Sequence, residues 1–269
     1  MLKDITIGQF FPAHSPLHRM DPRSKLLLLI LLIVFIFIAG NPFSMGLMAL
    51  FIIVLLFLSR VPVKTYLKNI KSIWIIILLT AVLNLFYVDE GRALVDWKFI
   101  HITTGGIERS IFMAVRIILL ILASAMLTYT TTPTALTDAI ERLLSPLKYI
   151  GLGTAVHTMA MMMTIALRFI PTLIEETEKI MNAQKARGAD MESGGLMKRL
   201  KALMPILIPL LVSSFRRAYD LAEAMECRCY NGGRGRQRMK QLKFGGVDLG
   251  AALLCMAVCT GVLLLGIFL

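Results

Sequence analysis

The chain has 269 residues, of which 57% are hydrophobic, and its mean hydropathy is +0.74. It also carries 29 Lys+Arg against 17 Asp+Glu, which gives a formal net charge of +12. These basic residues lie between long apolar runs, as in the cytoplasmic loops of membrane proteins, and not along a polar surface suited to nucleic acid. The composition therefore predicts an integral membrane protein in contact with a lipid bilayer, and no nucleic-acid partner.

The first apolar run follows a basic, turn-forming segment, Asp21-Pro-Arg-Ser-Lys25. Five runs are apolar enough to be membrane spans, although the first three are shorter than the ~20 residues of an ideal span. We expect flanking residues to extend those three helices. The predicted spans are residues 26–39, 43–58, 73–88, 107–129 and 247–269.

The distribution of Lys and Arg predicts the orientation of these helices. The loop at 89–106 holds only two basic residues, Arg92 and Lys98, whereas the segments between the other spans are rich in them. By the positive-inside rule, the N-terminus and residues 131–247 are expected in the cytoplasm, with the C-terminus outside. This predicts three regions: a membrane domain at 1–132, a cytoplasmic module at 133–246 and a final membrane helix at 247–269.

The cytoplasmic module is expected to contain three helices, so the predicted fold is an all-α integral membrane protein with about five transmembrane helices and three cytoplasmic ones. Thr132 and Pro133 have the residue types of an N-cap and a first helical position, which predicts a helix over 134–149. The two longer helices, at about 154–185 and 196–229, each begin apolar and end polar.

Two short segments at the ends of the long helices share one pattern. They read Ala183-Gln-Lys-Ala-Arg187-Gly188 and Ala224-Met-Glu-Cys-Arg228-Cys229, so each places an arginine between small residues. One interpretation is charge matching, since a cation near a helix C-terminus interacts favourably with the helix dipole. The repetition favours a second interpretation, in which each guanidinium enters an acidic groove of a partner and binds carboxylates or carbonyls.

Arg116 is the one charged residue deep in a predicted span, and such residues usually face the interior of the bundle or a polar partner. Asn84, in the third span, is the candidate partner. Outside the membrane, the acidic residues Glu175, Glu176 and Glu178 fall within about one helical turn, and we expect them to form a solvated face.

The sequence contains no P-loop, no His-Glu-x-x-His and no Gly-x-Ser-x-Gly. We therefore expect no enzyme activity, no cofactor and no metal site. The four cysteines suggest neither a zinc site nor a disulfide framework, and Cys255 and Cys259 are expected to be small packing residues of the last helix.

The chain resembles the transmembrane T component of energy-coupling factor (ECF) transporters, which are ATP-driven importers of vitamins and metals, over nearly its whole length. The resemblance rests on four segments taken together: Asp21-Pro-Arg-Ser-Lys25, Thr130-Thr-Thr-Pro133, Leu167-Arg-Phe-Ile-Pro171 and Ala183-Gln-Lys-Ala-Arg-Gly188. The opening Ile5-Thr-Ile-Gly-Gln-Phe-Phe-Pro12 is similar to T components that serve several substrate-binding subunits.

The resemblance implies two triplets that dock on two ATP-binding cassette ATPase subunits, namely Ala186-Arg187-Gly188 and Cys227-Arg228-Cys229. The second departs from the family's Ala-Arg-Gly pattern, and we expect its helix-stop role to pass to Gly232. The implied function is a scaffold: ATP binding would draw the ATPases together, and the two helices would transmit that motion to a substrate-binding membrane subunit.

A methionine-rich segment begins the second cytoplasmic helix, and together with Pro171 it is the candidate contact for the substrate-binding subunit, because methionine makes adaptable surfaces. The alternative is that these side chains fill an internal helix crossing. The methionines are Met159, Met161, Met162 and Met163.

Two other functions remain as alternatives. A stand-alone permease would need polar residues along several spans, and a membrane-embedded enzyme would need Asp, His or Cys clustered at one depth. The sequence does not specify the substrate.

Overall fold

The computed structural model describes residues 10–87, 93–97, 100–189, 195–232 and 243–268. The described chain is helical apart from one antiparallel hairpin. It divides into two compact units, with the boundary inside helix α6, Pro133–Leu143. We call the described residues 10–136 and 243–268 the core unit, and the described residues from 137 to 232 the α7–α8 unit.

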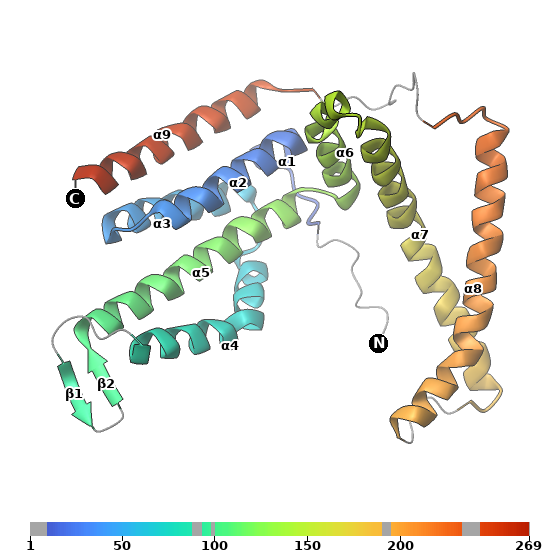
Figure 1. Cartoon of the computed structure of the whole chain (residues 1–269), viewed down its shortest axis with the longest axis horizontal. Helices are drawn as coiled ribbons and strands as arrows, with labels where there is room; N and C mark the ends of the chain where they lie inside the picture. Colours follow the sequence, from blue (N-terminus) through green and yellow to red (C-terminus); the bar gives the residue numbers. More distant parts are fainter. Residues whose placement is uncertain (1–9, 88–92, 98–99, 190–194, 233–242, 269) are drawn as a thin grey trace. The chain divides into compact units, whose positions relative to one another are not determined.

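The core unit contains the helices α1 to α5 and α9 (Figure 1). Several of them begin at a capping residue followed by proline, which is the expected start of a helix. Asp21, for example, accepts a hydrogen bond from the backbone N–H of Arg23 at 2.9 Å, directly before Pro22. The helices are α1 Pro16–Arg19, α2 Pro22–Ile38, α3 Pro42–Ser59, α4 Val63–Tyr87, α5 Thr104–Thr130 and α9 Gly246–Phe268.

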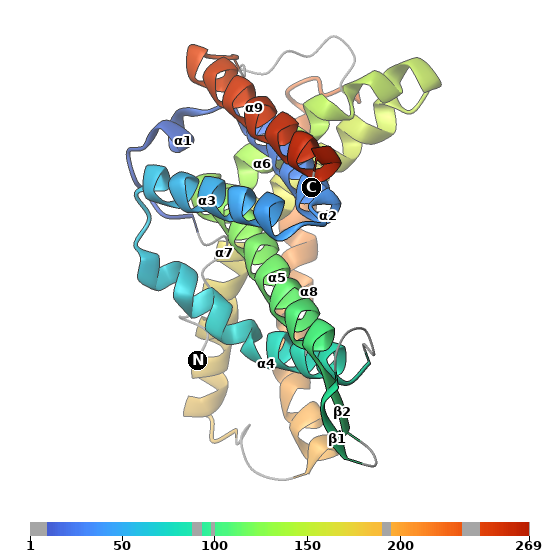
Figure 2. The same cartoon turned by 90° about the vertical axis from the view of Figure 1, so that its left-hand side faces the viewer.

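The hydrophobic core of this unit forms where α2, α3, α5 and α9 pack together, and Figure 2 shows α5 running past α3 and α4. Ile36, Met48 and Ile52 are almost fully buried there. Cys255 and Cys259 are also buried in this core, which confirms their prediction as packing residues. At Gly261 a Cβ atom would lie 3.2 Å from the Leu47 side chain, so glycine lets α9 approach α3 closely.

The segment expected to be a mixed loop contains the hairpin. Strand β1, Ala93–Trp97, pairs antiparallel with β2, Ile100–Thr103, and α5 follows directly. The hydroxyl of Thr103 caps α5 by accepting a hydrogen bond from the N–H of Gly106 at 3.1 Å. These strands were not predictable from the sequence, because each is short and lies between residues typical of loops.

The α7–α8 unit consists of most of α6, the 3-10 helix η2 at Ser145–Ile150, α7 at Gly153–Ala186 and α8 at Leu196–Glu226. The hydroxyl of Thr132 accepts a hydrogen bond from the N–H of Ala135 at 3.3 Å, and Pro133 begins α6, which confirms the predicted helix start. Glu141 of α6 contacts His157 of α7 at 2.9 Å. The helix α7 is continuous through Pro171.

Six helices in the described part of the chain are long and apolar enough to cross a membrane: α3, α4, α5, α7, α8 and α9. Four of them correspond to predicted spans. The first predicted span forms α2, which has only 17 residues. The helices α7 and α8, which were predicted to be cytoplasmic, each contain an apolar stretch of sufficient length. The protein is an all-α multi-pass membrane protein apart from the hairpin.

Candidate functional site

The helix α7 ends in a Schellman motif around Arg187. The N–H of Gly188 donates to the carbonyl of Lys185 at 3.0 Å, and the N–H of Ala189 donates to the carbonyl of Gln184, also at 3.0 Å. These are the two hydrogen bonds that define the motif, and they satisfy carbonyls that the helix end would otherwise leave unpaired. Gly188 has φ +83°, a left-handed conformation that glycine adopts without a steric penalty.

The helix α8 ends in the same way. The N–H of Cys229 donates to the carbonyl of Glu226 at 2.8 Å, and the N–H of Tyr230 donates to the carbonyl of Met225 at 3.0 Å. Cys229, with φ +56°, occupies the left-handed position that Gly188 has in α7. The expectation that Gly232 takes over the helix-stop role is therefore wrong: Cys229 terminates α8 despite its side chain.

Arg187 and Arg228 consequently occupy equivalent places, one residue before the left-handed position of a Schellman motif. Both arginines are exposed, and so are Ala186 and Cys227, the small residues that precede them. Within the described residues, neither guanidinium has a hydrogen bond or an ion pair. Each presents five N–H donors in a planar fork, which suits bidentate binding of a carboxylate or of carbonyl oxygens on another molecule.

The two helices run antiparallel, so their arginines lie at opposite ends of the pair (Figure 1). Between the two ends, Glu176 of α7 is bound by two side chains of α8. The Nη2 of Arg217 donates to Oε2 of Glu176 at 2.7 Å, and the hydroxyl of Ser213 donates to its other carboxylate oxygen. The prediction of a fully solvated acidic face is therefore wrong for Glu176, although Glu175 is exposed.

The methionines of α7 lie largely on its surface. Exposed fractions are 64% for Met159, 55% for Met162 and 47% for Met163, whereas Met161 is half-buried. Pro171 is exposed farther along the same helix. In the described chain, Met159, Met162 and Met163 therefore face outward and do not fill an internal helix crossing.

Arg116 of α5 does not pair with Asn84. Its Nη2 donates to the carbonyl of Ala39, which caps α2, at 2.7 Å, and its guanidinium lies 4.8 Å from the centre of the Phe112 ring. The amide of Asn84 donates instead to the carbonyl of Thr80 in its own helix at 2.8 Å. Arg116 thus ties the end of α2 to α5 within the core unit.

The basic segment at 21–25 joins three helices of the core unit. Asp248 of α9 accepts a hydrogen bond from the N–H of Asp21 at 2.9 Å, and the buried Lys25 donates to the carbonyl of Thr130 at 2.8 Å. Burial alone would raise the pKa of Asp21, but hydrogen bonds from Arg23 outweigh it and hold that pKa below its usual value.

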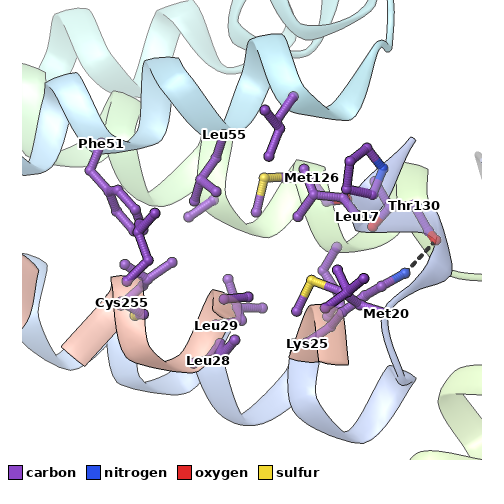
Figure 3. Close-up of a pocket in the computed structure, with 18 of the residues that line it drawn as sticks. Leu17, Met20, Lys25, Leu28, Leu29, Phe51, Leu55, Met126, Thr130 and Cys255 are labelled. Carbon is purple, nitrogen blue, oxygen red and sulfur yellow. Dashed lines mark hydrogen bonds between the residues drawn. The ribbon is translucent and has the colours of Figure 1, made fainter. Parts of the chain in front are cut away.

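Lys25 also borders an apolar pocket with a volume of about 330 Å³ (Figure 3). Aliphatic side chains of α2, α3, α5 and α9 make up most of its walls, and Figure 3 shows the Lys25 ammonium turned toward Thr130. Lys25, Thr130 and Cys255 are the few polar or titratable side chains in its lining, so it has the character of a hydrophobic pocket. Among the described residues there is also no group of three or more His, Cys, Asp or Glu side chains that could hold a metal ion.

Comparison with known proteins assigns the chain to a family. The sequence profile of the CbiQ family, described as "Cobalt transport protein", matches residues 13–240. The chain belongs to the CbiQ family. Members of this family with similar sequences are called energy-coupling factor transporter transmembrane protein EcfT, so the chain is a transmembrane component of an ECF transporter.

The similarity to these family members covers nearly the whole chain. The EcfT of Acidaminococcus fermentans is 52% identical over 258 residues, which are 96% of this chain and 95% of the relative. The EcfT of Clostridium kluyveri is 48% identical over 265 residues, 98% of this chain and 97% of the relative. The EcfT of Bacillus subtilis is 44% identical over 248 residues, 92% of this chain and 93% of the relative.

Proposed function

We propose that the protein couples ATP hydrolysis by two ATPase subunits to transport by a substrate-binding membrane subunit. In this proposal Arg187 and Arg228 each enter an acidic groove on one ATPase. The observation that carries it is the repeated geometry: two long helices of one unit end in the same Schellman motif, and each presents an exposed arginine one residue before its left-handed position.

The surroundings of the two arginines support docking over charge matching alone. Charge matching requires only a cation in the last turn of a helix, and Lys185 already supplies one in α7. It does not require that both cations occupy the same capping position or have small neighbours. A docking site requires both, because the guanidinium fork must reach its acceptors in a fixed direction.

The proposal includes an orientation and a second contact. The positive-inside rule places both arginine-bearing ends, like the ATPases, in the cytoplasm. Met159, Met162 and Met163 supply an exposed apolar surface on α7, which we assign to the substrate-binding subunit together with Pro171 and the half-buried Met161. The imported solute would be a vitamin or a metal, and the substrate-binding subunit would select it.

Co-purification with the two ATPases tests the docking proposal. Arg187→Glu and Arg228→Glu are each expected to weaken retention of the ATPases, and the double variant is expected to abolish it, because each change places a carboxylate in an acidic groove. Lys179→Glu in α7 and Arg216→Glu in α8 are matched controls, since both residues are exposed and the change in charge is the same. Full ATPase retention by the double variant would refute docking through these arginines.

A further inference from the structure

We propose that Glu176, Ser213 and Arg217 are positioning residues, which we call the crossing cluster, and that they fix how α7 crosses α8. The cluster thereby sets the separation and direction of Arg187 and Arg228. This inference rests on the proposed function, because it matters for transport only if those two arginines bind the ATPases.

The contacts in the cluster define both the register and the rotation of the two helices. Ser213 and Arg217 are four residues apart, so they lie on one face of α8 in successive turns. Each donates to a different oxygen of the same Glu176 carboxylate. If α7 slid along α8 or rotated about its own axis, the Glu176 carboxylate would lose one of these two donors.

Apolar packing between the two helices specifies much less. Of the described residues of α7 and α8, only Ala160 and Ile206 are buried apolar side chains. Hydrophobic contacts are non-directional, so a thin apolar contact allows helices to slide and rotate. The amide of Gln184 in α7 also donates to the carbonyl of Pro205 in α8, but at a long 3.5 Å. The crossing cluster therefore supplies a directional contact that this apolar packing does not.

The cluster is placed symmetrically with respect to the two arginines. Arg187 follows Glu176 by 11 positions in α7, and Arg228 follows Arg217 by 11 positions in α8. Eleven residues are close to three helical turns, which corresponds to a length of about 16 Å and a return to nearly the same helix face. Because both arginines lie at a similar distance from the crossing, a change of crossing angle about the cluster moves both of them by similar amounts.

The modest burial of the cluster fits a role in geometry. The side chains of Arg217 and Glu176 are 34% and 22% exposed. Ion pairs with this much contact with water add little to stability, so removing the cluster is expected to leave the chain folded. What it supplies is a fixed angle between two helices that must present their ends to two partners at once.

Spin-label distances in the full chain test this inference directly. Cys227→Ser leaves Cys229 as the exposed native thiol, because Cys255 and Cys259 are buried, and Ala189→Cys adds a site beside Arg187. We expect a narrow distance distribution in nanodiscs. Arg217→Glu should shift or broaden it by repulsion from Glu176, and the exchanged pair Glu176→Arg/Arg217→Glu should restore it. The matched controls Glu175→Arg and Arg216→Glu should leave it unchanged.

An unchanged distribution in Arg217→Glu, or failure of the exchanged pair to restore it, would overturn the positioning role. A second measurement uses the complete transporter. Arg217→Glu should retain both ATPases yet lower the solute imported per ATP hydrolysed about fivefold or more, with recovery in the exchanged pair. An unaltered import ratio would overturn the link to coupling. Failure of the docking proposal would show differently, as full ATPase retention when both Arg187 and Arg228 are changed to Glu.

Discussion

The interactions that hold the core unit together differ from those that hold the α7–α8 unit together. Nearly all buried apolar side chains among the described residues belong to the core unit, whereas the α7–α8 unit contributes only Ala139, Ala160 and Ile206. Long apolar stretches of α7 and α8 remain exposed in the isolated chain. The core unit therefore has a buried apolar centre of its own, which the α7–α8 unit largely lacks. In both units, the apolar helix surfaces that remain exposed have to be covered by bilayer or partner subunits.

The polar contacts follow the same division. In the core unit, Asp248 and Lys25 are both buried and bind backbone groups of distant segments. In the α7–α8 unit, the Arg217–Glu176 pair is half-exposed. A buried polar contact is costly to break because its partner is left without water, and a half-exposed one is not. Substitutions at these polar residues should therefore destabilise the core unit, whereas in the α7–α8 unit they should alter how the two helices cross.

The largest loss in the free energy of unfolding is expected for Asp248→Ala. This change removes the acceptor for the N–H groups of Asp21, at 2.9 Å, and Gly245, at 2.7 Å. The loss is expected to be about 2 kcal/mol, since the Asp21 group lies in a buried site. Thermal unfolding in nanodiscs would measure it. Asp248→Asn keeps one acceptor oxygen and should lose less, and Ser213→Ala in the other unit should lose only about 0.5 kcal/mol. Equal losses for Asp248→Ala and Ser213→Ala would contradict the comparison.

A smaller loss is expected for Gly188→Ala. A Cβ atom at Gly188 meets no other atom within 4 Å, so the cost comes from its left-handed backbone alone. That cost is about 1 kcal/mol. Hydrogen exchange should report it as faster exchange of the Gly188 and Ala189 amides, which close the Schellman motif. Gly188→Asn is the control, because asparagine tolerates this conformation, and it should preserve slow exchange.

At the end of α8, substitution of the left-handed residue is expected to increase stability. Cys229 adopts the left-handed conformation with a side chain, so Cys229→Gly should stabilise that helix end by up to about 1 kcal/mol. The measurement is hydrogen exchange of the Cys229 and Tyr230 amides, which should become slower. Cys229→Ala keeps a Cβ atom and should have no such effect. If alanine and glycine protected the end equally, backbone strain would not be the cause.

The smallest effect is a pH dependence confined to the core unit. Burial lowers the pKa of His18, whose ring nitrogens contact the Ser15 hydroxyl at 2.7 Å and the Phe11 carbonyl at 3.0 Å. The folded chain thus binds this proton more weakly than the unfolded chain. Stability from this group is complete above about pH 6.5 and is lost as the pH falls below that value.

Thermal unfolding between pH 7.5 and pH 5.5 would measure this dependence, and His18→Gln should remove part of it. The same change of pH should leave the amide protection factors at the ends of α7 and α8, which are exchange rates corrected for the intrinsic effect of pH, unaltered, because His18 belongs to the other unit. An identical pH dependence in His18→Gln would exclude this histidine as its source.

Local sequence patterns were sufficient to predict the helices and some of their ends, although α4 begins at Val63, ten residues before the predicted span, and α6 ends at Leu143, before the predicted end. Apolar runs, the Thr132–Pro133 helix start and the matched arginine segments all depend on neighbours within a few residues. The partners of Arg116 and Glu176 were not predictable in this way, because Ala39 and Arg217 are 77 and 41 positions away. Which distant group a polar side chain meets is decided by helix packing. The left-handed Cys229 was missed because residue type alone favours glycine there.

The hydrogen bond between the Asp21 backbone and Asp248 has a consequence for biogenesis. It joins residues 227 positions apart, and α9 is synthesised after all the other described helices. During translation, the amide at the start of α2 therefore stays unpaired by protein until α9 has entered the membrane beside it. Insertion of α9 closes the bundle, so a nascent chain interrupted before Asp248 retains an open edge that quality-control proteases can recognise.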